Sequence, residues 1–169
     1  SLYEPVALPG RQNPVTVPSE EQLLSAYRRE VLRHTERETK PLVARIEERL
    51  RDGGDEKRLR NRLGVVYARF GRLEEAEREF RRVLALSDSV PALVNLGNIA
   101  YLRQDWRTAL EYYQRAEVRL PNDPQVLLPV ARVHHKLENY VQAREAYVKL
   151  KNLDTRLAGR FAYLGMEGH

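Results

Sequence analysis

The chain of 169 residues contains no cysteine and no long hydrophobic run. The absence of cysteine excludes disulfides, iron–sulfur clusters, thiolate zinc sites and a cysteine nucleophile, and leaves the redox compartment open. No apolar stretch approaches the roughly 18 residues that a membrane helix needs, so we expect no membrane-spanning segment.

Motifs of catalysis are also lacking. The sequence has no nucleophile elbow, no phosphate-binding loop and no His-Glu-x-x-His pattern, and it contains only four histidines. His134 and His135 are adjacent, so on a helix their side chains point about 100° apart and cannot chelate one ion together. We therefore expect a non-enzymatic protein with no metal and no cofactor.

Charge is plentiful and unbalanced, with a formal net charge of +5 and 29 basic residues, of which only five are lysine. Such a balance could attract nucleic acid, anionic lipid or an acidic protein. Arginine suits bidentate recognition of carboxylates wherever several converge.

The first 18 residues hold four prolines and no apolar periodicity, which predicts an extended tail or tether. The proline-rich start without methionine favours a processed, exported bacterial protein, and a cytoplasmic location stays open.

The remainder reads as successive helical pairs. Residues 19–54 are predicted to form a first pair, because Ser19 begins a capping box, Pro41 suits the first turn of a second helix, and Gly53-Gly54 suits a helix end. Residues 55–156 contain three more pairs, and residues 157–169 contain a C-terminal capping helix over about 157–166. The predicted helices of the three pairs are 57–70 and 73–87, 91–103 and 106–119, and 124–137 and 140–153.

Small residues recur within these three pairs at a fixed period of 33 and then 34 residues. They are Gly64 and Ala76, Gly97 and Ala109, and Ala131 and Ala143. A fixed period of this length predicts a stacked helical array. Two helices approach closely only where small residues meet, so we expect Gly64 and Gly97 to face the alanines of the partner helices.

Together with the large residues at fixed offsets, this pattern resembles the tetratricopeptide (TPR) repeat. The second repeat matches best, at Leu93, Leu96, Gly97, Ala109, Tyr113, Ala116 and Pro121. The first departs at Arg60, where the family prefers a large apolar residue, and the third has Ala131 and His134 in place of glycine and tyrosine. The resemblance covers repeats at about 57–89, 90–123 and 124–157. It implies an all-α, right-handed α–α superhelix (a TPR-like solenoid of antiparallel helix pairs) whose first helices line a concave groove for an extended peptide or a partner's helix.

The family's inward positions map onto eleven candidate peptide-binding residues, called the groove residues below. They are Arg58, Asn61, Arg62, Arg69, Asn95, Asn98, Tyr101, Leu102, Arg132, His135 and Lys136. Val65, Val94, Gln125 and Leu128 also occupy inward positions. None of these fifteen is acidic, whereas the acids between Lys57 and Leu137 fall on second helices or loops.

This segregation predicts an adaptor or scaffold whose groove binds an acidic or carboxylate-bearing peptide. The four groove arginines would pair with carboxylates, Asn95 and Asn98 would hold the peptide backbone, and Tyr101 with Leu102 would offer an apolar pocket. A chaperone-tail carboxylate clamp is not expected, because of its required side chains only Asn95 stands in place.

Two other functions stay open. The basic groove with Tyr101 could track RNA or another polyanion, although the acidic outer stretch from Glu74 to Glu79 and the single obvious stacking aromatic count against it. Alternatively, the chain is an assembly subunit that docks, or forms an oligomer, through its terminal helices.

Overall fold

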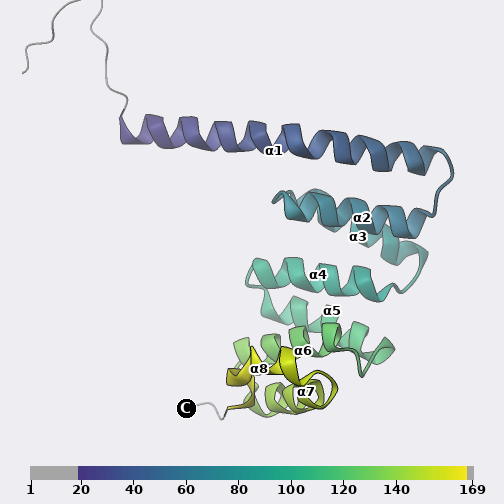
Figure 1. Cartoon of the computed structure of the whole chain (residues 1–169), viewed down its shortest axis with the longest axis vertical. Coiled ribbons are helices and arrows are strands. Elements are labelled where there is room, and N and C mark those ends of the chain that lie inside the picture. Colours follow the sequence, from purple (N-terminus) through teal and green to yellow (C-terminus); the bar gives the residue numbers. More distant parts are fainter. Residues whose placement is uncertain (1–18, 167–169) are drawn as a thin grey trace, which may run out of the picture. The chain divides into compact units, whose positions relative to one another are not determined.

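The structure is a computed structural model that describes residues 19–166, so the predicted tail over residues 1–18 and the last three residues lie outside it. Every regular element in the described part is a helix (Figure 1). The elements are α1 (Glu20–Arg51), α2 (Glu56–Arg69), α3 (Leu73–Leu86), α4 (Val90–Leu102), α5 (Trp106–Arg119), α6 (Pro124–Lys136), α7 (Tyr140–Leu153), α8 (Thr155–Gly159) and the 3₁₀ turn η1 (Ala162–Gly165). Within residues 19–166, no helix is both long and apolar enough to cross a membrane.

The predicted helical pair over residues 19–54 is replaced by the single helix α1. The capping box forms, since the Ser19 amide donates to Gln22 Oε1 at 2.9 Å and the Gln22 amide donates to Ser19 Oγ at 3.2 Å. Pro41 lies inside the helix instead of opening a new one. Proline removes one N–H from the ladder and its ring crowds the carbonyl four residues earlier, but no glycine stands beside it to end the first helix. The chain turns only at Gly53, whose φ is +79°.

The structure divides into two compact units, residues 1–38 and 39–169. In the first unit, the α1 segment carries a row of exposed apolar side chains that no other described element of that unit covers. Their exposed fractions run from 45% at Val31 to 69% at Tyr27.

The second unit contains three helical hairpins, α2–α3, α4–α5 and α6–α7, stacked in chain order (Figure 1). Their bounds lie within one residue of those predicted. Each hairpin turns through a residue with left-handed backbone at an equivalent position, namely Gly71, Gln104 and Glu138, with φ of +76°, +61° and +60°. Asp55, Ser89, Asp105 and Asp123 each accept a backbone N–H from the first turn of the next helix.

The repeated glycines face aromatic rings of the partner helices, a contact that the period did not predict, and their approach to the alanines stays a prediction. A Cβ built at Gly64 would meet ring atoms of Phe80 at 2.5–2.8 Å, and one at Gly97 would overlap the ring of Tyr113. Ala76 and Ala109 are fully buried and belong to the core clusters of the stack. The glycine therefore makes room for the ring four residues after each alanine.

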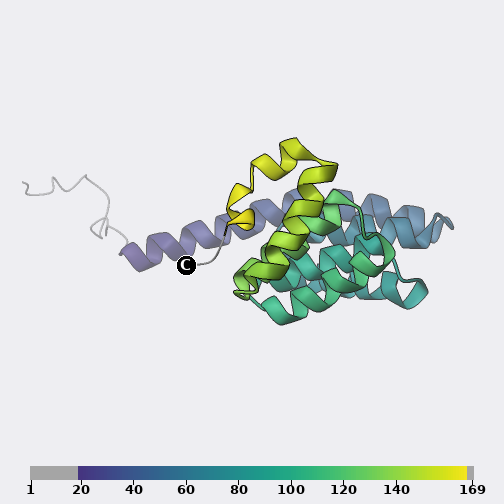
Figure 2. The ribbon, with the colours of Figure 1, turned by 90° about the horizontal axis from the view of Figure 1, so that it is seen from below.

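The C-terminal cap consists of two short pieces, α8 and η1, where one helix was predicted. Ala158 and Leu164 are buried, and the ring of Tyr147 packs against Gly165. Figure 2, which looks along the stack, shows this segment lying beside α7. In the second unit, helices contact mainly their neighbours in the chain, as expected of a solenoid.

Candidate functional site

The first helices of the three hairpins are almost free of acidic residues. Helix α2 contains only Glu56, its first residue, and helices α4 and α6 contain none. The groove residues all lie on these three helices. The charge segregation that the sequence suggested is therefore present in the fold.

Several acids of the outer helices and loops pair with arginines. Glu77 pairs with Arg81 at 2.7 Å and with Arg103 at 2.6 Å, and the Arg103 hydrogen bond is the main cause of a lowered Glu77 pKa. Arg119 binds Asp88 at 2.8 Å and lowers the pKa of that carboxyl in the same way. Part of the outer surface thus carries compensated charge.

The groove arginines have no such partners. Within residues 19–166, Arg58, Arg62, Arg69 and Arg132 form no ion pair. Three of them are exposed on α2, and Arg132 on α6 is partly buried. Uncompensated positive charge on the first helices attracts anions.

Arg60 accounts for the departure of the first repeat from the family pattern. Its guanidinium binds Glu56 at 2.8 Å and Glu79 at 3.1 Å, so it crosses to α3 and stays out of the groove. The Glu79 side chain is only 9% exposed and also binds Arg82. A charged pair thus replaces an apolar contact within the α2–α3 hairpin.

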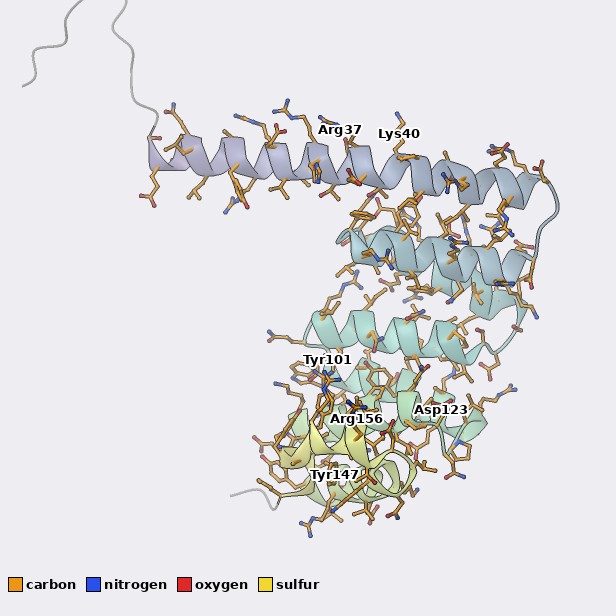
Figure 3. The ribbon with its side chains drawn as sticks, viewed as in Figure 1. Arg37, Lys40, Tyr101, Asp123, Tyr147 and Arg156 are labelled. Atoms are coloured by element: carbon orange, nitrogen blue, oxygen red, sulfur yellow. The ribbon has the colours of Figure 1, made fainter. Side chains whose placement is uncertain are left out.

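A cavity of about 400 Å³ opens between α4 and α6. Four groove residues line it: Asn98, Tyr101, Leu102 and Arg132. The other lining residues are Val94, Tyr113, Gln125, Leu128 and Pro129. Figure 3 shows Tyr101 at the C-terminal end of α4.

Arg132 is held in this cavity by two aromatic rings. Its Cζ lies 5.1 Å from the ring centre of Tyr101 and 5.6 Å from that of Phe161. Both distances suit cation–π attraction. Its Nε is buried and has no hydrogen-bond partner.

Asn98, which lines the same cavity, is held by a hydrogen bond from Tyr113 on α5. The Tyr113 hydroxyl donates to Asn98 Oδ1 at 2.7 Å. Burial raises the pKa of Tyr113 well above its usual range, so the hydroxyl stays protonated and remains a donor.

The remaining groove residues lie apart from the cavity. Asn95 Nδ2 donates to Asn61 Oδ1 at 3.3 Å, which links α4 to α2. The ring of His135 packs edge-on against two tyrosines, and Lys136 Nζ lies 5.5 Å from the ring centre of Trp106.

His134 occupies the core position that the family gives to tyrosine. It is 9% exposed, burial lowers its pKa, and Asn139 Nδ2 lies 3.3 Å from its Nδ1. No group of three or more potential metal ligands occurs in the part of the chain that the structure describes.

The sequence did not point to Tyr113 as part of the cavity or to Phe161 as a partner of Arg132. Tyr113 sits at a core position of the repeat, and nothing in the spacing shows that its hydroxyl reaches Asn98. Phe161 belongs to the cap, outside the repeat register, so no offset could bring it to Arg132. Pro129, by contrast, stands one helical turn before Arg132 and shares its face.

Comparisons with known proteins agree with this architecture. Sequence models of the family described as Tetratricopeptide repeat match residues 43–91 and 92–125. The mouse (Mus musculus) protein Tetratricopeptide repeat protein 8 is 24% identical over 103 residues, which are 61% of this chain and 20% of that protein. The chain thus spans only about a fifth of that relative's length.

Solved structures share the fold at low sequence identity. A crystal structure of MamA superposes with a TM-score of 0.62 and 18% identity, covering 78% of this chain and 83% of MamA. A tetratricopeptide repeat protein from Parabacteroides merdae superposes with a TM-score of 0.63 and 16% identity, covering 79% of this chain and 58% of that one. The repeat period, the hairpin stack and these matches make the chain a member of the tetratricopeptide repeat family, with an α–α solenoid fold.

Proposed function

We propose that the chain is a non-enzymatic adaptor whose groove binds an acidic or carboxylate-bearing segment of a partner protein. The observation that carries the proposal is the acid-poor surface of α2, α4 and α6, on which Arg58, Arg62, Arg69 and Arg132 form no ion pair within residues 19–166, whereas acids and arginines mix on the outer helices. Acids on the outer helices and loops offset much of the arginine charge there, so we expect the strongest positive field over the basic residues of α2 and α6.

Contacts available in the groove suit an extended acidic segment. Exposed Arg58 and Arg62 lie one turn apart on α2 and can each meet a carboxylate, while the Asn61–Asn95 pair presents amide groups to a peptide backbone. Leu102, 67% exposed beside the cavity, offers an apolar contact. The partner itself is defined here only by this chemistry.

Charge reversal tests the proposal. Changing Arg58, Arg62 and Arg132 together to Glu should weaken binding of a fluorescent glutamate-rich peptide by at least about tenfold, since a charge-assisted hydrogen bond contributes about 1.5–3 kcal/mol. The measurement is fluorescence anisotropy at fixed ionic strength, with circular dichroism to verify folding.

A matched control changes Arg78, Arg107 and Arg156 to Glu. These arginines are exposed, lie outside the groove, and form no ion pair within residues 19–166, so net charge changes by the same amount. Equal loss in both triple variants would mean that net charge alone attracts the peptide. Full binding by the folded groove variant would remove the groove from the mechanism.

One observation favours a second candidate, binding of single-stranded RNA. Cations and rings alternate near the C-terminal end of the groove, with Arg132 over Tyr101, Lys136 over Trp106 and Arg160 over Phe161. Such interleaving suits base stacking together with phosphate contact. Competition between a single-stranded RNA and the glutamate-rich peptide decides between the two, because the adaptor requires the peptide to bind more tightly.

A further inference from the structure

Arg132 stands out because its guanidinium is fixed in place but not satisfied. The Nε atom is buried without a hydrogen-bond partner, and no carboxylate of residues 19–166 pairs with this side chain. The buried Nε cannot itself reach a ligand, but the terminal NH₂ groups of this guanidinium also form no hydrogen bond within residues 19–166 and can donate to one. The rings of Tyr101 and Phe161 hold the guanidinium at the cavity wall without using its N–H groups.

Asn98 is a donor towards the same cavity. Its Oδ1 already accepts the hydroxyl hydrogen of Tyr113 at 2.7 Å. An amide that is held by its oxygen leaves its NH₂ group to bind a ligand. Without Tyr113 the amide could turn over and present oxygen instead.

The walls around these two donors are largely apolar. Val94, Leu102, Leu128 and Pro129 line the cavity, and its volume of about 400 Å³ falls within the range of small-ligand pockets. A polar anion alone would leave these walls without a partner. The fitting ligand carries an aliphatic group directly beside its negative charge.

We propose that this cavity is a subsite for a carboxylate flanked by an aliphatic side chain, with Arg132 and Asn98 as its donors and Tyr113 as the positioning residue that orients Asn98. The inference rests on the proposed function and goes further, because it assigns the selection of one kind of peptide to this cavity. The exposed arginines of α2 then attract acidic peptides without distinguishing among them. Two peptide sources share this chemistry: a C-terminal aliphatic residue, and an internal Asp or Glu next to an aliphatic residue.

Three labelled peptides on the full chain distinguish the sources. The first is a Gly-Ser peptide ending in Leu as the free acid, the second is its C-terminal amide, and the third is an amidated peptide with an internal Glu-Leu pair. The second peptide carries no carboxylate. We expect it to bind at least about tenfold more weakly than the first or the third peptide, whichever binds more tightly. The tighter of those two identifies the source.

Arg132→Gln should weaken the preferred peptide by about ten- to a hundredfold, whereas Arg58→Gln should weaken it only a few-fold. If Arg132→Gln fails to fold, Leu102→Glu tests the same point, because Leu102 is 67% exposed and a carboxylate there would compete for Arg132. Val141→Glu is the matched control, since Val141 is 63% exposed on α7 and does not line the cavity.

The positioning role of Tyr113 is tested by a double-mutant cycle. Tyr113→Phe should weaken binding about three- to tenfold in the native background and should have no further effect once Asn98 is alanine. A purely structural role would lower affinity equally in both backgrounds. Tyr147→Phe, the equivalent change one repeat later, should leave affinity within about twofold.

The outcomes separate this inference from the proposed function. If all three peptides bind equally, or if Leu102→Glu and Val141→Glu act alike, the subsite is overturned while glutamate-rich peptides can still bind the groove. If Tyr113→Phe matches Tyr147→Phe, the positioning role is overturned. If neither these peptides nor a glutamate-rich peptide binds, the proposed function falls as well.

Discussion

Replacing Gly97 with alanine tests how the repeat signature supports both the fold and the groove. A Cβ at this position would overlap the ring of Tyr113, and two further ring atoms would lie only 2.6 and 2.9 Å away. The ring is 2% exposed, so it cannot swing into solvent to make room. The helices or the ring must therefore shift.

The expected size of the effect follows from two opposing terms. Alanine is favoured over glycine inside a helix by about 1 kcal/mol. Overpacking a core against a rigid ring costs about 1–3 kcal/mol, and the overlap here puts the cost at the upper end of that range. The free energy of unfolding should therefore fall by about 1–2 kcal/mol.

Urea denaturation followed by circular dichroism measures this change, and Gly159→Ala is the matched control. A Cβ at Gly159 meets nothing within 4 Å, so that variant should be as stable as the native chain or slightly more stable. Gly97→Ala should also weaken peptide binding, because a displaced ring moves the hydroxyl that holds Asn98. A Gly97→Ala variant with undiminished stability would refute the reasoning.

Three other outcomes are expected. Glu79→Gln should destabilise the chain by about 1–3 kcal/mol in urea denaturation, because it leaves Arg60 without its partly buried carboxylate, whereas Glu74→Gln, at a side chain 77% exposed, should change stability by less than about 0.5 kcal/mol. Burial lowers the pKa of His134 below 6.5, so the unfolded chain takes up a proton first as the pH falls, and stability should decline from about pH 6.5 downwards; His134→Leu should flatten that decline between pH 7 and pH 5. Deleting residues 1–38 should leave the unfolding free energy of the rest within about 1 kcal/mol, since residues 39–169 form their own compact unit, and a larger loss would contradict that division.

Helix bounds in the repeats could be predicted because local chemistry marks them. A left-handed turn residue recurs at the same place in each hairpin, the first helices are capped by Asp55, Ser89 and Asp123, and prolines mark the starts of α4 and α6. The predicted end of a helix before Pro41 was wrong, because the local chemistry there does not end a helix. Thr39-Lys40-Pro41 has the spacing of the Ser89-Val90-Pro91 start of α4, but no glycine ends a helix before it, and the cost of the lost hydrogen bond and the crowded ring is outweighed by the rest of a 32-residue helix.

The repeat register predicted the groove only at the level of single helices. It gave the side chains that share a face, and these include most of the lining of the cavity. It could not give Phe161, which reaches Arg132 from outside the repeats, or the hydrogen bond of Tyr113 to Asn98, because both contacts depend on how separate elements pack. It also gave Gly97 the wrong neighbour, since the period fixes spacing along the chain and not the direction of a ring.

Because the hairpins of the second unit contact mainly their neighbours in the chain, tension applied to them would not be shared by the whole unit at once. Under tension each hairpin would unfold separately, when its interface with one neighbouring hairpin and the contact between its own two helices are lost. The chain would therefore lengthen in separate steps and refold in the reverse order. A partner bound across α4 and α6 would clamp two adjacent hairpins together. Binding at the cavity alone would resist separation of these two hairpins, whereas a longer segment that also contacts Arg58 and Arg62 would link the α2–α3 hairpin to them.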